Sequence, residues 1–178
     1  MLIISTGSRL APGFDLVDQQ LLHAFRKITS PRIETYAENL DLIRFPAEHF
    51  QRIFNEYLTA KYAGFPPDLV ILVFVGNLRV PATMLPQLFP GTPIVVAGLT
   101  EEEFHPDQFS RLVSGLAQRV DPRANLELIL RVQPEIRRVV VIGGTAEVDR
   151  QVLQRIKKAG DSFNERVAID FWDNLSMA

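Results

Sequence analysis

Short polar segments rich in glycine follow several apolar runs, and they hold the residues best suited to bind a small molecule. Thr6-Gly7-Ser8-Arg9 combines hydroxyl groups, backbone N–H groups and a guanidinium, which together could hold a carboxylate or a phosphate. Trp172 and Asn174 follow the last apolar run, where an indole and an amide suit ligand contact better than catalysis. The candidate ligand-binding residues are Ser8, Arg9, Asn77, Leu78, Gly98, Leu99, Thr145, Trp172 and Asn174. The alternative for each segment is a plain strand-to-helix turn, and for Trp172 a place in the core or at a lobe interface.

Residue types that carry catalysis are missing or wrongly spaced. The chain has no cysteine, which excludes thiolate nucleophiles and Cys-ligated metal sites. No two of His23, His49 and His105 share the spacing of metal ligands, and neither Ser5 nor Ser8 lies in a G-x-S-x-G elbow. We therefore expect no catalytic residue and no metal, and a binding protein rather than an enzyme. The alternatives from different classes are a small cytosolic α/β enzyme and a receiver-like signalling domain with a single flavodoxin-type sheet.

The segment Ile142-Gly143-Gly144-Thr145 invites a dinucleotide-binding interpretation. A G-x-G-x-x-G motif counted from Gly143 would need glycine at Thr145 and at Val148, and neither position has it. The P-loop spacing is absent as well. We expect a weak anion site or a tight turn here, and no cofactor.

Composition limits the class of partner. The chain has 178 residues, with 19 Lys and Arg against 21 Asp and Glu, and its pI is about 5.9. Because no basic cluster interrupts this balance, a nucleic-acid partner is not expected. The longest apolar run, Leu69 to Val75, is far shorter than the roughly 18 to 20 residues that span a bilayer, so we expect the chain to be soluble.

Apolar runs alternate with amphipathic stretches, which is typical of a parallel sheet covered by helices on both faces. Strands are predicted at 2–5, 33–40, 69–75, 93–97, 112–116, 138–142 and 166–172. Helices are predicted after Asp15, over 50–62 and 80–89, from Asp121-Pro122 to Pro134, and from Thr145 to Gly160. The pattern breaks between Glu101 and Val120. Either all strands form one doubly wound sheet, or this break marks the crossing from one α/β lobe to a second.

Several strings, taken in order, resemble the sensor domains of bacterial histidine kinases that are related to ABC-transporter substrate-binding proteins. They are Asn39-Leu40-Asp41-Leu42-Ile43-Arg44-Phe45-Pro46, Lys61-Tyr62-Ala63-Gly64-Phe65-Pro66-Pro67-Asp68-Leu69-Val70-Ile71, Leu88-Phe89-Pro90-Gly91-Thr92-Pro93-Ile94-Val95, Ser114-Gly115-Leu116, Val120-Asp121-Pro122, and Leu130 followed by Pro134. The resemblance runs from about Ile3 to the end of the chain.

The resemblance implies a periplasmic-binding-protein-like fold, with a flavodoxin-like parallel sheet lobe at 1–112 and a crossing segment with an incomplete second α/β lobe at 113–178. It also implies that a small solute is held between two lobes, and that closure is transmitted to a downstream kinase module. A substrate-binding component of an ABC transporter is the alternative. The resemblance places the native protein on the periplasmic side of the cytoplasmic membrane, anchored by a segment missing here. An unfinished apolar sheet in the second lobe makes a homodimer plausible.

Overall fold

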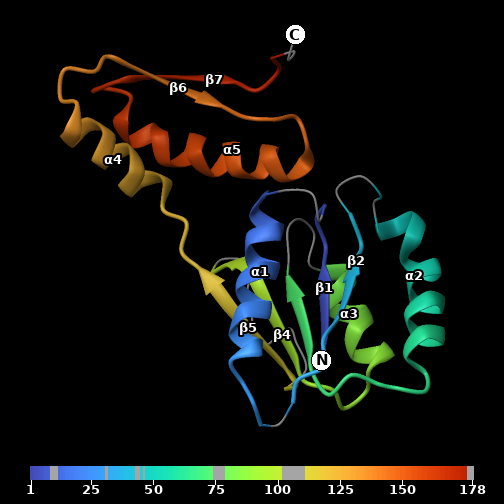
Figure 1. The fold of residues 1–178 in the computed structure, drawn as a ribbon. Helices are drawn as coiled ribbons and strands as arrows, with labels where there is room; N and C mark the ends of the chain where they lie inside the picture. Colours follow the sequence, from blue (N-terminus) through green and yellow to red (C-terminus); the bar gives the residue numbers. More distant parts are fainter. Residues whose placement is uncertain are drawn as a thin grey trace. The chain divides into compact units, whose positions relative to one another are not determined.

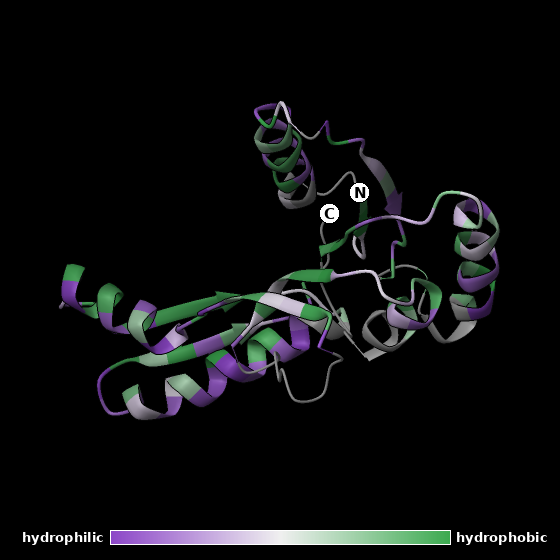
Figure 2. Ribbon diagram, turned by 90° about the horizontal axis from the view of Figure 1, so that it is seen from below, coloured by the Kyte–Doolittle hydropathy of each residue, from purple (hydrophilic) through white to green (hydrophobic). Residues whose placement is uncertain are grey.

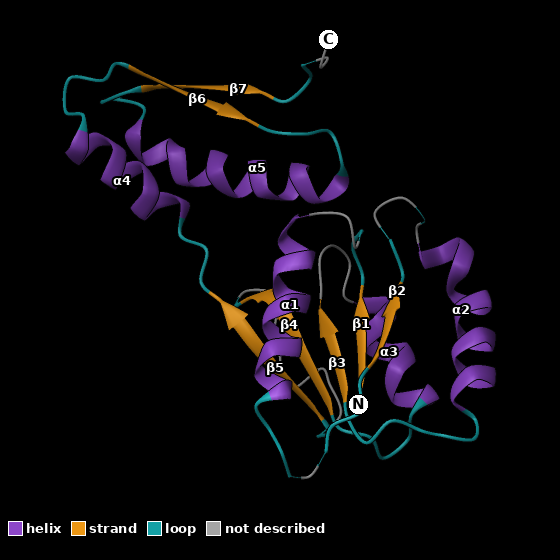
Figure 3. Cartoon of the chain, viewed as in Figure 1, coloured by secondary structure: helices purple, strands orange, loops and turns teal. Residues whose placement is uncertain are grey.

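The chain forms two compact units, Met1–Gln118 and Arg119–Ala178, in a computed structural model. The structure describes residues 1–8, 12–30, 32–42, 45, 47–73, 79–101 and 111–175. Figure 1 shows the order of helices and strands, and Figure 3 shows the same elements by type. The strands fall into two separate sheets, so the single doubly wound sheet is not what the chain forms.

The first unit is a five-stranded parallel sheet in the order β2-β1-β3-β4-β5. Its elements are β1 (Leu2–Ser5), α1 (Pro12–Arg26), β2 (Tyr36–Asn39), α2 (Ala47–Tyr62), β3 (Val70–Val73), α3 (Arg79–Leu88), β4 (Ile94–Thr100) and β5 (Val113–Gln118). All four neighbouring pairs are parallel. The chain moves from β1 to β2 on one side and then returns to β3 on the other, so the strand order reverses between β1 and β3.

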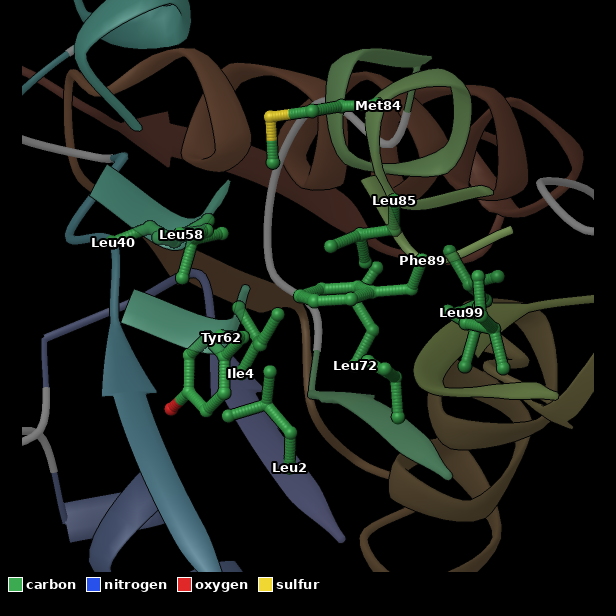
Figure 4. Close-up of a cluster of buried hydrophobic side chains, with 13 residues drawn as sticks. Leu2, Ile4, Leu40, Leu58, Tyr62, Leu72, Met84, Leu85, Phe89 and Leu99 are labelled. Carbon is green, nitrogen blue, oxygen red and sulfur yellow. The ribbon is translucent and has the colours of Figure 1, made fainter. Parts of the chain in front are cut away.

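Apolar side chains on both faces explain why β1 and β3 lie in the middle of this sheet. Every residue of LIIS in β1 and VILV in β3 is buried. Leu2, Ile4 and Leu72 pack under α2 and α3 in the larger cluster, which Figure 4 shows with Leu58, Leu85 and Phe89. The residues between them in sequence point to the other face, where Ile3, Ile71 and Val73 pack with Leu21 and Phe25 of α1. Each such leucine or isoleucine contributes about 1.5 to 3 kcal/mol by its burial.

The helices bury one side each, as amphipathic helices do, and Figure 2 shows hydrophobic and hydrophilic residues interleaved along them. In α2, Leu58 and Tyr62 are buried one turn apart, while Arg52 and Glu56 form an exposed ion pair. The helix α1 begins at Pro12, ahead of the predicted cap Asp15, which lies in the first turn and accepts a hydrogen bond from Gln19 Nε2 at 2.8 Å. No helix in the described part of the chain is long and apolar enough to cross a membrane.

The second unit is smaller and holds its own core. Its elements are α4 (Pro122–Val132), β6 (Arg138–Ile142), α5 (Glu147–Gly160), the 3₁₀ helix η2 (Asp161–Phe163) and β7 (Ala168–Trp172). The strands β6 and β7 pair in parallel. Leu126 and Leu130 of α4 pack with Phe163 and Val167, and Val139 and Ile169 of the sheet lie against this cluster.

Most predicted elements are found close to their expected bounds, and the predicted α/β fold class is confirmed. The helix start at Asp121-Pro122 is confirmed, because the Asp121 carboxylate accepts a hydrogen bond from the N–H of Ala124 at 3.0 Å and Pro122 opens the helix. The strand predicted at 112–116 is β5, and it pairs with β4 in the first sheet. The two units therefore divide after Gln118, later than the boundary after Leu112 that we expected.

Candidate functional site

The carboxyl edge of the first sheet is the natural ligand position in this unit, since parallel α/β sheets bind ligands where the strand order reverses. Backbone hydrogen bonds hold the segment after β1 between its two neighbours. The N–H of Thr6 donates to Val73 O at 3.0 Å on the β3 side. On the β2 side, the N–H groups of Leu40 and Leu42 donate to Ser5 O at 2.8 Å and Thr6 O at 2.7 Å. These hydrogen bonds hold the segment that leads from β1 to Ser8 at the point where the strand order reverses.

Asp41 lies beside this segment in the left-handed region, with φ of 43°. The Asn39 side-chain oxygen accepts a hydrogen bond from the N–H of Asp41 at 3.1 Å, which closes an Asx turn. Asn and Asp adopt this backbone conformation more readily than other side chains, so the spacing Asn39-Leu40-Asp41 signals the turn. Sequence reasoning did not include Asp41 in the site, although its carboxylate lies at the same edge as Ser8.

The end of β4 is irregular at Gly98. Its φ is 94°, and the pairing with β5 shifts register between Ala97 and Leu99, as at a β-bulge. Gly98 is exposed, whereas Leu99 is fully buried in the larger core cluster and Thr100 is 7% exposed. Of the two residues predicted here, Gly98 is therefore open at the carboxyl edge and the Leu99 side chain belongs to the core.

Ser8 is half-buried and lies three residues after β1 ends at Ser5. Gly98 lies two residues before β4 ends at Thr100. Because β1 and β4 flank β3 in the parallel sheet, both residues lie near its carboxyl edge. The other predicted residues of this edge, Arg9, Asn77 and Leu78, lie outside the described residues.

The second unit has a carboxyl edge of its own, formed by the ends of β6 and β7. The N–H of Gly143 donates to Trp172 O at 3.1 Å, which brings the two strand ends together. Thr145 follows β6 and is exposed, Trp172 ends β7 with 43% of its surface exposed, and Asn174 is exposed beyond it. The structure thus brings Thr145, Trp172 and Asn174 to one edge, as the sequence pattern predicted.

The glycines after β6 are explained by packing within the unit. A Cβ atom at Gly143 would lie 2.8 Å from both Cδ atoms of Leu153. At Gly144 it would lie 2.9 Å from Cγ of Asp149, whose carboxylate accepts a hydrogen bond from the N–H of Ala146 at 3.2 Å. This carboxylate covers the start of α5, where a nucleotide phosphate would need to bind. The structure thus favours a tight turn over an anion site.

The chemistry available at both edges is binding through hydroxyl, amide and backbone groups, with an indole for apolar contact. Among the described residues, no group of three or more His, Asp and Glu side chains is placed to hold a metal ion.

Comparison with known proteins shows which solved structures share the fold of this chain. No protein-family model matches the sequence, and no curated protein is detectably similar to it. Solved structures do match over nearly the whole chain. A conserved domain protein from Vibrio cholerae superposes with a TM-score of 0.62 at 15% identity, covering 98% of this chain and 57% of that one. The ABC domain from Streptococcus pneumoniae in complex with L-Trp gives 0.59 at 12% identity, with 97% and 56% covered. The chain has a periplasmic-binding-protein-like fold.

A substrate-binding protein with adhesive properties from Clostridium difficile, solved ligand-free and open, shares the periplasmic-binding-protein-like fold. Its TM-score is 0.57 at 16% identity, and the match covers 98% of this chain and 57% of that chain. The present chain therefore spans less than two thirds of the length of each of these three structures.

Proposed function

We propose that this chain is part of a domain that binds a small solute outside the cytoplasmic membrane and reports it to a histidine kinase module. The observation that carries the solute-binding part is the fold, which is shared over 97% of the chain with a structure in complex with L-Trp. The kinase part rests on the sequence strings that resemble sensor domains. The proposed activity is binding without catalysis, with a small molecule as ligand.

The ligand contacts would come from the carboxyl edges of the two sheets. In the first unit these are the Ser8 hydroxyl, the backbone at Gly98 and the Asp41 carboxylate. In the second they are the Thr145 hydroxyl, the Asn174 amide and the Trp172 indole. A solute shifts the conformational equilibrium of the domain toward the state in which it makes additional contacts, and this shift is what an attached kinase would detect.

A substrate-binding role in an ABC transporter is the second candidate, because one of the similar structures is a substrate-binding protein. Assays on the full-length protein separate the two roles. Ligand-dependent autophosphorylation supports the sensor, whereas ligand-dependent uptake with a partner permease supports the transporter component. Protease accessibility of the domain in spheroplasts tests the proposed location outside the cytoplasmic membrane.

Isothermal titration tests solute binding directly. L-Trp is titrated first, followed by pools of amino acids, carboxylates, nucleosides and oligopeptides. We expect heat from one class and none from the others. No heat from any class with the full-length protein would remove the support for this function.

Variants then locate the site once a binding class is found. Thr145→Ala and Asn174→Ala should each weaken binding by about tenfold, the effect of losing one hydrogen bond of roughly 1.4 kcal/mol. Thr59→Ala removes the same hydroxyl group from the exposed side of α2 and is the matched control. Equal affinities of Thr145→Ala, Asn174→Ala and Thr59→Ala would show that the ligand binds elsewhere.

A further inference from the structure

The edge strand β2 carries few apolar side chains. Its sequence is Tyr36-Ala37-Glu38-Asn39, whereas the neighbouring strands β1 and β3 read LIIS and VILV. Hydrophobic burial, which fixes β1 and β3 in the middle of the sheet, therefore contributes less to the placement of β2. Polar contacts must supply part of what holds its carboxyl end in place.

Glu38 supplies such contacts through both oxygens of its carboxylate. Oε1 accepts hydrogen bonds from Lys61 Nζ at 2.6 Å and from the Tyr62 hydroxyl at 2.8 Å, and Oε2 accepts one from the Tyr57 hydroxyl at 3.1 Å. The three donors lie in the last two turns of α2. Because the Glu38 side chain is only 10% exposed, these charge-assisted bonds are little weakened by water. Glu38 therefore ties β2 to one end of α2.

The donors are also held by one another. Lys61 Nζ donates to the Tyr57 hydroxyl at 2.9 Å and lies 5.3 Å and 5.7 Å from the ring centroids of Tyr57 and Tyr62. The Tyr62 ring meets the Tyr36 ring edge to face, with 6.1 Å between the centroids. The end of α2 thus presents a preformed set of donors to the Glu38 carboxylate.

Three residues after Glu38 lies Asp41, whose carboxylate is a proposed solute contact. The left-handed backbone at Asp41, with φ of 43°, is uncommon for a residue other than glycine and persists only where its surroundings hold it. Asn39, the residue next to Glu38, helps to hold it by accepting the hydrogen bond from the N–H of Asp41 at 3.1 Å. A displacement of β2 at Glu38 would therefore move Asn39, and Asp41 with it.

We propose that Glu38 is a positioning residue of the solute site, which keeps the turn at Asp41 in place through its hydrogen bonds to α2. This inference rests on the proposed function, because that function assigns the Asp41 carboxylate to the solute. Glu38 acts through Asp41 and does not itself contact the solute, since its own carboxylate is engaged by the three donors of α2.

Amide hydrogen exchange, measured by NMR on the solute-free chain, tests the positioning itself. The N–H groups of Leu40 and Leu42 bond to β1 and the segment after it, whereas the N–H of Thr6 bonds to Val73 O on the β3 side. In Glu38→Ala, exchange at Leu40 and Leu42 should rise by roughly tenfold while exchange at Thr6 stays close to that of the wild type. Equal rises at all three amides would mean that the whole sheet is loosened, and no rise would mean that Glu38 does not hold the turn. Either result would overturn the proposal.

Two further variants make the exchange result specific to Glu38. Glu38→Gln keeps the side-chain length and one oxygen acceptor, so its rise at Leu42 should be smaller than that of Glu38→Ala. Glu56→Ala is the control, because it removes from α2 a carboxylate that forms an exposed ion pair with Arg52 at 3.2 Å. It should leave exchange at Leu42 unchanged. A rise in Glu56→Ala as large as that in Glu38→Ala would contradict a specific role of Glu38.

A double-mutant cycle in solute binding tests whether Glu38 acts through Asp41. The probe is L-Trp or, where L-Trp gives no heat, the solute class that gives heat in the titration above. Glu38→Ala and Asp41→Asn should each weaken binding by about tenfold. The double variant should bind no more weakly than Asp41→Asn alone. Additive losses would show that Glu38 does not act through Asp41.

The two measurements separate this inference from the proposed function. If the wild-type protein binds none of the solutes, the proposed function fails, while the exchange rates at Leu40 and Leu42 still show whether Glu38 holds the turn. If a solute binds but the exchange rates at Leu40 and Leu42 do not respond to Glu38→Ala, the positioning role fails and the proposed function stands.

Discussion

Glu38 joins the edge strand β2 to the last turns of α2. Its carboxylate accepts hydrogen bonds from Lys61 Nζ at 2.6 Å, from the Tyr62 hydroxyl at 2.8 Å and from the Tyr57 hydroxyl at 3.1 Å. The Glu38 side chain is only 10% exposed, so these donors replace the water that it loses. The hydrogen bond to Glu38 raises the pKa of Lys61, and burial followed by the hydrogen bond to Glu38 raises the pKa of Tyr62.

These pKa shifts predict how stability depends on alkaline pH. A group whose pKa is higher in the folded state stays protonated there while the unfolded chain already loses its proton. The stabilisation is therefore complete below the ordinary tyrosine pKa of 10.0 and is lost as pH rises above it. Tyr62→Phe should flatten this alkaline decline, measured as the unfolding free energy against pH. Parallel curves for Tyr62→Phe and the wild type would contradict the role of the Tyr62 hydroxyl.

The Asp121 carboxylate stabilises the start of α4 by accepting a hydrogen bond from the N–H of Ala124. Asp121→Ala should lower the unfolding free energy of the second unit by about 1 kcal/mol, the usual effect of losing an N-cap. Asp121→Asn keeps an oxygen acceptor at the same place and should be close to neutral. Urea unfolding followed by Trp172 fluorescence measures both variants, and equal losses would argue against capping.

The turn between β6 and α5 needs glycine because of its neighbours. Gly143→Ala would place a methyl group 2.8 Å from the Leu153 side chain, which must then move out of its packed position. We expect a loss of about 1 to 3 kcal/mol, as for other overpacked sites. Gly13→Ala is the control, because among the described residues no atom outside its chain neighbours and the backbone of its own helix lies within 4 Å of the new Cβ, and alanine favours the helix α1. A Gly143→Ala protein as stable as Gly13→Ala would show that Leu153 adapts freely.

Strands whose bounds depend only on the residues within and next to them could be predicted from the sequence. The strands β1 and β6 are found at the predicted residues, because continuous apolar runs end at Ser5-Thr6 and at Gly143. The carboxyl edges were predictable too, since they follow from parallel topology. Leu99 was not, because the bulge at Gly98 shifts the alternation and turns the Leu99 side chain into the core. That shift depends on pairing between β4 and β5, which no local pattern contains.

The two units have separate cores, and different aromatic residues give the spectroscopic signal for the unfolding of each. Tyr36, Tyr57 and Tyr62, which are all the tyrosines of the chain, lie in the first unit, and Trp172 lies in the second. The first sheet has five strands packed by clusters on both faces, whereas the second has two strands covered on one face. The first unit should therefore be the more stable of the two.

Urea unfolding should accordingly occur in two steps. Trp172 fluorescence is expected to change at a lower urea concentration than the near-ultraviolet tyrosine signal, because the second unit buries less apolar surface per residue on folding. A fragment of residues 1–118 should keep the tyrosine midpoint of the full chain, since both of its hydrophobic clusters lie within it. Coincident midpoints for Trp172 and tyrosine, or a fragment that does not fold, would instead mean that the two units stabilise each other.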